Sequence, residues 1–224
     1  MTPADPGGAA PRELCARPRA VGRDELTVPG PEAARRLLGR LLLRTEADGS
    51  ETIARIVETE AYHQQDPASH SHRGQTPRTA PMFAAAGTAY VYRSYGIHWC
   101  CNVSVEPEGV GAAVLVRAAA VLAGHDRVRA RRDTAHRDRD LLRGPGRLCA
   151  GLDVDGPRHD GGDLVAGVAG LRLADDGWRP DAADIAATPR VGVRLAPDVC
   201  WRFHLADEPT VSPYRRHPRA EPAA

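Results

Sequence analysis

The sequence predicts an α+β fold, with a single domain built on a curved, mostly antiparallel β-sheet and flanking helices. Its 224 residues are enough for one sizeable hydrophobic core. Short segments rich in β-branched, aromatic and apolar residues recur along the chain, separated by turn residues such as Asp48-Gly49, a pattern typical of strands joined by hairpins. Segments with helical periodicity are few and short, and no internal repeat is visible.

The first predicted elements are a helix and a β-hairpin. A helix is expected over Pro31–Leu38, because proline occupies its first turn and Gly39 follows its end. Strands at Arg40–Thr45 and Glu51–Tyr62 flank the Asp48-Gly49 turn, so the sheet should begin with an antiparallel pair.

Later elements alternate between strands and loops. The Pro, Gly, Ser, His and Asp content of residues 63–87 and 155–163 predicts loops. Further strands are expected at residues 88–95, 97–105, 112–121, 164–173 and 190–195. Trp201 and Phe203 are expected to pack beneath the sheet.

An arginine-rich segment separates the two groups of strands. Residues 124–147 carry eight arginines interleaved with aspartates, which predicts a solvated helical face rather than a phosphate clamp. Gly144-Pro145 precedes a predicted short helix at Arg147–Leu152, whose N-terminal amides could bind a phosphate.

Both ends of the chain are predicted to be disordered tails. Residues 1–25 are rich in Pro, Gly, Ala and Arg and show no periodicity, and residues 215–224 have the same character. The folded domain is therefore expected to span residues 26–214.

Composition argues against several classes of protein. The formal net charge is +1, so a nucleic-acid-binding face would have to come from a local concentration of basic residues. The five cysteines are odd in number and irregularly spaced, which argues against a disulfide framework. There is no signal peptide and no apolar run long enough to cross a bilayer, so a cytoplasmic protein without a membrane partner is expected.

Residues that could take part in catalysis or binding are concentrated between Ile56 and Arg117. In a strand, Glu58, Glu60 and Tyr62 would project from one face, and two acids with a phenol are a poor way to build a core. A solvated strand face is the alternative. Five of the ten aromatic residues are Tyr62 or lie within 90–99, a clustering that favours a site.

The tyrosines of 90–95 divide between two expected positions. In a regular strand Tyr92 and Tyr95 would point to opposite faces. One of them would line a pocket, and the other would cap a hairpin tip before Gly96, which tolerates positive φ.

The order and spacing of several motifs carry a resemblance. The chain resembles the alkyladenine (3-methyladenine) DNA glycosylase family over about residues 26–214, including Gly144–Cys149 and Pro189–Val193. The motifs are Val-Glu-Thr-Glu-Ala-Tyr, Asp-Pro-Ala-Ser-His-Ser, Thr-Pro-Arg, Tyr-Val-Tyr-x-x-Tyr-Gly and Cys-x-Asn. The chain departs from the family pattern at Thr79, Ile97, Cys101 and 84–87, which puts the lesion range in doubt more than the reaction.

The resemblance implies a protruding β-hairpin and a monofunctional enzyme that starts base excision repair. Such an enzyme flips alkylated or deaminated purines (3-methyladenine, 7-methylguanine, hypoxanthine or ethenoadenine) out of duplex DNA and hydrolyses the N-glycosidic bond. It implies no cofactor and no metal. The partner is double-stranded DNA containing damaged purines, and a monomer located in the cytoplasm at the nucleoid is expected.

The resemblance also implies a role for each matching residue. Glu60 matches the general base that activates water, and Arg117 and the main chain of Val211 match positions that place this water. Tyr95 matches the wedge that fills the vacated stack. The base-binding positions are Tyr62, His70 and Tyr92, which sandwich the flipped base, and Asn102, which crowds the amino group of normal guanine. Arg117 as a structural salt-bridge partner is an equal alternative.

Rival readings remain open. The histidines and cysteines at 63, 70, 72, 98, 100 and 101 suggest zinc, but they lack the usual ligand spacing. A carbohydrate hydrolase using Glu58 and Glu60 fits poorly, because neighbours on one strand face lie roughly 6–7 Å apart. A glycosylase specialised for bulky alkyl adducts is one alternative, and a non-enzymatic lesion-binding protein is the other.

All 30 basic residues are arginines. A glycosylase that also nicks DNA attacks C1′ with an amine, ordinarily from lysine or an N-terminal residue. Arginine stays protonated and cannot replace lysine. The N-terminal amine would sit on the predicted tail, so water is the expected nucleophile.

Overall fold

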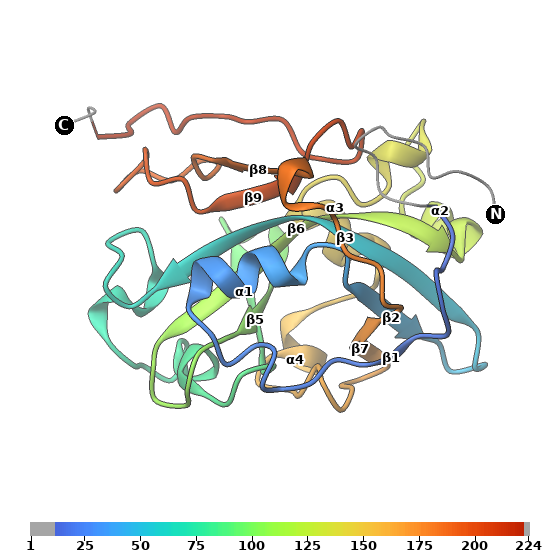
Figure 1. Ribbon diagram of the computed structural model, residues 1–224, viewed down its shortest axis with the longest axis horizontal. Coiled ribbons are helices and arrows are strands. Elements are labelled where there is room, and N and C mark those ends of the chain that lie inside the picture. The colour runs from blue at the N-terminus through green and yellow to red at the C-terminus, as the bar shows by residue number, and fades with distance from the viewer. Residues whose placement is uncertain (1–11, 222–224) are drawn as a thin grey trace.

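The computed structural model describes residues 12–221 and shows a sheet with helices packed against it (Figure 1). Nine strands of these residues form the sheet in the order β1-β7-β2-β3-β6-β5-β4, with β9 paired to β3 and β8 to β9. Every strand pair in it is antiparallel. The predicted single-domain α+β fold is confirmed.

The strands are β1 (Arg19–Ala20), β2 (Leu41–Thr45), β3 (Glu51–His63), β4 (Ala89–Ser94), β5 (His98–Ser104), β6 (Ala112–Ala123), β7 (Leu171–Asp175), β8 (Ile185–Thr188) and β9 (Arg202–Leu205). The α-helices are α1 (Gly30–Leu37), α2 (His125–Arg131), α3 (Pro145–Gly151) and α4 (Gly156–His159). Short 3₁₀ turns lie at His70–Arg73, Ala80–Phe83, Asp138–Asp140 and Ala182–Asp184. No helix of the described residues is long and apolar enough to cross a membrane.

Helix α1 packs on the sheet through one apolar stripe. Ala33, Ala34 and Leu37 are spaced to share a face of the helix and are buried. In the view of Figure 1 the helix lies in front of β3. The chain then turns at Gly39, where φ is +84° and an added Cβ would lie 2.8 Å from the Trp178 ring. Glycine is therefore required where the predicted helix stops.

Strand β3 is the branch point of the sheet. Along one edge it pairs with β2 through Glu51–Arg55 and then with β9 through Glu58–Glu60. Its other edge pairs with β6, with irregular register between Ile56 and Thr59. A β-bulge of this kind redirects side chains locally. The two glutamates consequently lie where three strands meet.

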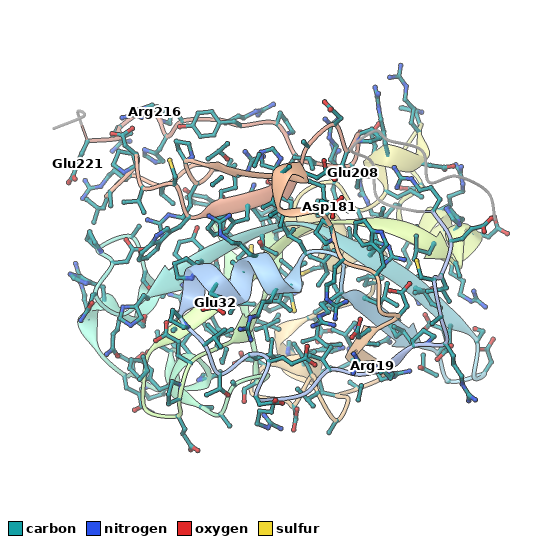
Figure 2. All side chains as sticks on the ribbon, viewed as in Figure 1. Arg19, Glu32, Asp181, Glu208, Arg216 and Glu221 are labelled. Atoms are coloured by element: carbon teal, nitrogen blue, oxygen red, sulfur yellow. The ribbon has the colours of Figure 1, made fainter. Side chains whose placement is uncertain are left out.

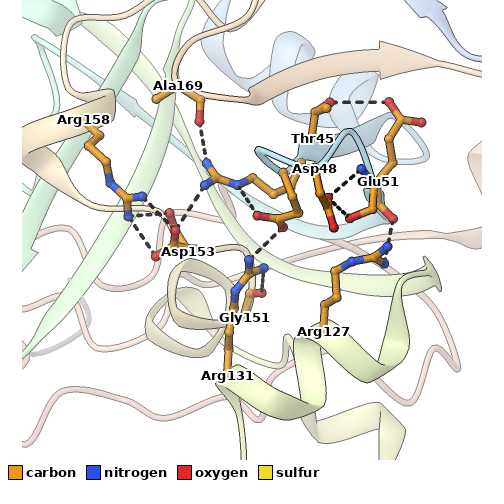
Figure 3. Close-up of polar contacts among 12 residues, drawn as sticks. Thr45, Asp48, Glu51, Arg127, Arg131, Gly151, Asp153, Arg158 and Ala169 are labelled. Carbon is orange, nitrogen blue, oxygen red and sulfur yellow. Dashed lines mark hydrogen bonds and ion pairs between the residues drawn. The ribbon is translucent and has the colours of Figure 1, made fainter.

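An ion-pair network ties β2 to α2 and to the turn between α3 and α4 (Figure 3). Asp153 accepts hydrogen bonds from Arg44 at 3.1 Å and from Arg158 at 2.8 Å. Arg131 donates to Glu46 at 2.7 Å. These arginines are held by acids within the protein.

Part of the predicted N-terminal tail is ordered, so this expectation is wrong for that part. Strand β1 pairs with β7, and Val21 is buried in the main core. Residues 1–11 and 222–224 of the predicted tails lie outside the described residues. At the other end, the carbonyl of Arg215 accepts a hydrogen bond from the Gly192 N–H, and the Glu221 N–H donates to the Arg194 carbonyl. Composition cannot reveal this docking, because it depends on a few contacts with a segment about 20 residues earlier in the chain.

Two predicted strands are misplaced. Strand β7 begins only at Leu171, because Gly167 and Gly170 adopt positive φ and turn the chain before it. Residues 190–195 form no strand, and β8 and β9 lie on either side of them. The Val191 N–H donates to the side chain of Glu60, so it is not available for a strand ladder.

The remaining predictions hold with small changes. Val128 is the buried residue of α2, so this helix is mostly solvated, as expected from its charge pattern. Helix α3 begins two residues before the predicted start. Helix α4 interrupts the predicted loop 155–163, where the Asp155 side chain caps it by accepting from the Arg158 N–H. Phe203 is buried, and Trp201 packs against the same core.

Candidate active site

The strand registers build the floor of a cavity. They place Tyr90, Asn102, Leu115 and Glu60 opposite one another in a row across β4, β5, β6 and β3. Residues paired in this way share one face of the sheet. All four line a cavity of about 540 Å³, a size that suits a small-molecule group.

Glu60 is the one carboxylate among the described residues that line this cavity. Its side chain is fully buried. Oε2 accepts hydrogen bonds from the Tyr62 hydroxyl at 2.8 Å and from Nη1 of Arg117 at 3.2 Å. Oε1 accepts from the Val191 N–H at 2.7 Å. Three donors from three separate segments hold the carboxylate in place.

Glu58 is buried beside it but does not line the cavity. Its Oε1 accepts from Nε of Arg117 at 2.9 Å and from Nε of Arg202 at 2.7 Å. Burial by itself favours the neutral acid, but the charges of Arg117 and Arg202 outweigh it and hold the pKa of Glu58 below its ordinary value. Ser212 donates to it through both its N–H and its hydroxyl. Glu58 is therefore an ionised support for Arg117.

Arg117 joins the two glutamates. It is buried, lines the cavity and donates to both carboxylates. Burial disfavours its charge, but Glu60 and Glu58 raise its pKa above the ordinary value. Glu58 and Glu60 share Arg117, and Tyr62 donates to Glu60, so the prediction that the three lie on one strand face is confirmed. The alternative of a solvated face is excluded, because both glutamates are buried and Tyr62 is half-buried.

A second buried ion pair backs the Tyr62 ring. Arg190 donates to both carboxylate oxygens of Asp66, and its guanidinium lies 4.8 Å from the centre of the Tyr62 ring. Burial and the charge of Glu60 raise the pKa of Tyr62 well above its ordinary value, so the phenol remains a donor. Arg190, Asp66 and Val191 are contributors that sequence reasoning missed. All three lie in or beside the quoted motifs, but nothing in the pattern reveals their contacts with β3.

His70 and Tyr92 meet in the cavity wall. Their ring centres are 4.6 Å apart with an interplanar angle of 74°. Nδ1 of His70 lies 2.9 Å from the Tyr90 hydroxyl. Partial burial, and then the charge of Arg78, lower the pKa of His70, so its imidazole is neutral at pH 7. The two touching rings leave no space for another ring between them.

Asn102 is fixed within the floor. Its side chain is buried, and Nδ2 donates to the Tyr90 carbonyl at 2.9 Å. Cys100, two residues earlier on β5, also lines the cavity. The amide is thus held at a defined orientation beside the site.

Tyr95 occupies the tip of the β4–β5 hairpin. The Ile97 N–H donates to the Ser94 carbonyl, and Tyr95 and Gly96 both have positive φ, 49° and 69°. This two-residue turn matches the twist of the flanking strands. The Tyr95 side chain is 85% exposed and Ile97 66%. Tyr95 caps the tip, as predicted. The predicted division between the two tyrosines is wrong, however, because Tyr92 and Tyr95 both line the cavity.

A model of the methylpurine-DNA glycosylase family matches residues 24–209. The chain belongs to this family. A protein of Nocardia farcinica is 47% identical over 210 residues, covering 91% of this chain and 96% of the relative. A Burkholderia orbicola protein is 46% identical over 182 residues, covering 81% and 85%. A Streptomyces avermitilis protein is 40% identical over 197 residues, covering 87% and 92%. All three carry the provisional name 3-methyladenine DNA glycosylase.

The expectation of a DNA glycosylase, a hydrolase of N-glycosidic bonds, is confirmed by this membership. The two-carboxylate carbohydrate hydrolase does not fit the glycosylase site, because Glu58 is withdrawn from the cavity. For the zinc alternative, no group of three or more His, Cys, Asp or Glu side chains in residues 12–221 is arranged to hold a metal ion.

Val211 is not brought into the cavity of the glycosylase. Its carbonyl accepts from Nε of Arg143 at 2.9 Å, and its N–H donates to the Glu208 carbonyl. The contact with the site passes through the next residue, Ser212, which donates to Glu58. The main chain of Val211 is therefore next to the Glu58 cluster and does not line the cavity.

Basic groups concentrate at the cavity. Arg78, Arg93 and Arg194 line it, and none of them has an acidic partner among residues 12–221. The ion-paired arginines of Figure 3 lie outside the lining. A net charge of only +1 is thus compatible with a local positive surface around the site.

Proposed function

We propose that this chain is a monofunctional DNA glycosylase that removes alkylated and deaminated purines from double-stranded DNA. The substrates we propose are 3-methyladenine, 7-methylguanine, hypoxanthine and ethenoadenine. The carrying observation is the buried carboxylate of Glu60, the one carboxylate among the described residues that line this aromatic-walled cavity. Arg78, Arg93 and Arg194 line it too and have no acidic partner among residues 12–221. The enzyme would act as a monomer in the cytoplasm, at the nucleoid, and start base excision repair.

The first step of the proposed mechanism is extrusion of the damaged base. A base inside a duplex cannot reach a cavity, so it must be flipped out. Tyr95 at the exposed hairpin tip would enter the gap in the stack. Arg78, Arg93 and Arg194 would bind the flanking phosphates, because they have no acidic partner among the described residues.

The flipped purine would then stack against aromatic walls. His70 and Tyr92 touch, so the purine would lie between this pair and Tyr62, whose ring is backed by Arg190. Stacking of this kind is worth roughly 1–3 kcal/mol per base. Neutral His70 would offer a hydrogen-bonding edge to the purine, and Asn102 would crowd the 2-amino group of normal guanine.

Hydrolysis would follow at C1′. A carboxylate offers about four lone-pair positions, and three of those on Glu60 are occupied by Tyr62, Arg117 and Val191. The remaining position can accept a proton from a water molecule, as a general base does. The negative charge would also stabilise the positive charge that develops on the sugar. Arg117 would keep Glu60 ionised and oriented.

The test is release of free base from alkylated duplex DNA. Purified protein would be incubated with duplexes that each carry one lesion, and the released base and the abasic site would be measured by chromatography and alkaline cleavage. Lesion-dependent release, lost in Glu60→Gln, supports the proposal. Tight lesion binding without any release would establish the rival reading, a lesion-binding protein without enzymatic activity.

A further inference from the structure

The last described residues of the chain reach the candidate site. We call residues 213–221 the C-terminal strap. The family model ends at residue 209, so the strap lies beyond the part of the chain that it matches. Within the strap, His217 is half-buried and lines the cavity that also contains Glu60. One side chain of the cavity wall thus comes from outside the family-defined region.

The strap is held along the segment that follows β8. The Gly192 N–H donates to the Arg215 carbonyl at 2.8 Å, and the Glu221 N–H donates to the Arg194 carbonyl at 3.0 Å. Figure 1 shows the strap running beside β8 and β9. The contacted segment, 191–195, also lines the cavity.

One ion pair adds to these two backbone contacts. Arg216 donates to Asp198 at 2.6 Å, and both side chains are more than two-fifths exposed. Figure 2 places Arg216 and Glu221 near the same end of the strap, and the two are joined through the Glu221 carbonyl. An exposed ion pair contributes little to stability.

The other walls are held far more firmly. Glu60, Asn102 and Tyr90 are buried in the sheet and fixed by its registers. None of the strap residues 213–221 is buried. His217 accepts hydrogen bonds from the Ala220 N–H and the Arg219 N–H, which are both in the strap. Its position in the cavity wall therefore depends on how the strap is held.

We infer that His217, held in place by the C-terminal strap, sets the upper size limit of the base that the cavity accepts. The ligand class is a purine that carries a substituent larger than a methyl group. The His217 side chain excludes large substituents from its part of the cavity by steric contact, and truncation of this side chain enlarges the cavity there. The inference rests on the proposed glycosylase function and names a specificity-determining residue for it.

The test compares full-length variants that change the wall in opposite directions. His217→Ala enlarges the cavity, and His217→Trp reduces it. Single-turnover excision would be measured on duplexes of one sequence that carry hypoxanthine, ethenoadenine or a guanine with a bulky N7-alkyl group. The readout is the rate on each bulky lesion divided by the rate on hypoxanthine.

In His217→Ala, this ratio should rise by about tenfold for at least one bulky lesion, the scale on which pocket shape discriminates related substrates. The ratio should fall in His217→Trp. Arg216→Ala releases the strap from Asp198, so it should also raise the ratio of excision rates, as His217→Ala does. The matched control is Arg219→Ala. This residue has no acidic partner in residues 12–221 and does not line the cavity, so its loss should leave the ratio unchanged.

The outcomes separate the two ideas. Unchanged ratios in both His217 variants, with hypoxanthine excision retained, overturn the role of the strap and leave the proposed function standing. Absence of base release by the wild-type protein from every lesion overturns the proposed function, and the inference with it.

Discussion

The Tyr62 hydroxyl donates a hydrogen bond of 2.8 Å to Oε2 of Glu60. The contact links the proposed stacking surface to the proposed general base within one strand, two residues apart. Because burial and the Glu60 charge raise the pKa of Tyr62, the phenol keeps its proton and the bond persists across the neutral pH range. A base stacked on Tyr62 is therefore positioned relative to the carboxylate by a rigid element.

Replacement of this carboxylate is the first prediction. Glu60→Gln should keep lesion binding and lower single-turnover excision by at least about a hundredfold, the usual loss for a general base. Tyr62, Arg117 and Val191 all donate hydrogen bonds to Glu60. The NH₂ group of the glutamine would face at least one of these donors, and this unfavourable contact should lower the free energy of unfolding by about 1–3 kcal/mol. Excision near the wild-type rate by a folded variant contradicts the assignment.

In contrast to Glu60, Glu58 should contribute to the stability of the fold and not to the chemical step. Its pKa is lowered in the folded state, so its carboxylate stabilises the fold fully above the ordinary glutamate pKa, and this contribution is lost as the pH falls through the lower folded-state pKa. Glu58→Gln should cost about 3–5 kcal/mol at pH 7, because Arg117 and Arg202 lose a buried partner. Free energies of unfolding would be measured by urea titration at a series of pH values from 7 downwards. The difference between Glu58→Gln and the wild type should become smaller as the pH falls.

A matched control for this change is Glu32→Gln. Glu32 pairs with Arg36 on the exposed face of α1, and such pairs contribute little. A loss of stability as large as that of Glu58→Gln would show that the burial of the Glu58 pair is not the cause.

The hairpin tip gives a third prediction. Tyr95→Ser should weaken duplex binding and slow base extrusion, because the 85% exposed side chain at the tip is lost while the turn at Gly96 remains. Excision of lesions in unpaired contexts should suffer less. Binding and single-turnover rates on paired and unpaired lesions measure this, and equal losses on both would count against a wedge.

Asn102→Ser should relax the exclusion of guanine. The smaller side chain leaves room for the 2-amino group and removes the bond from Nδ2 to the Tyr90 carbonyl. Excision of undamaged guanine should rise by about tenfold, whereas hypoxanthine, which lacks the amino group, serves as the control lesion. If a folded variant rejects guanine as strictly as the wild type, selection lies elsewhere.

The absence of lysine predicts the product. All 30 basic residues are arginines, which stay protonated and cannot form a Schiff base. The enzyme should leave free base and an intact abasic site, with strand breaks only after alkali. Incubation with lesion DNA and borohydride is the measurement, and a trapped covalent adduct would falsify the water-only mechanism.

The local sequence pattern by itself determined several elements of the fold and of the candidate site. The alternation of Glu58, Glu60 and Tyr62 places all three on one face, and this follows from strand geometry alone. The Tyr95-Gly96 tip follows from the tolerance of glycine for positive φ. The helix over Gly30–Leu37 and most strands up to residue 123 were likewise predictable, because each depends on periodicity within a short segment.

Tertiary structure decided which glutamate faces the cavity. Glu58 and Glu60 have the same spacing and chemistry in the sequence. The bulge in β3 and the pairing with β9 bring Arg202 within reach of Glu58, and Ser212, which follows β9 in the chain, also donates to it. Glu60 is left to line the cavity. Likewise, Val191 meets Glu60 across 131 positions and His217 reaches the cavity from the strap. Contacts between distant segments depend on the register and branching of the whole sheet, and a local sequence pattern carries no record of them.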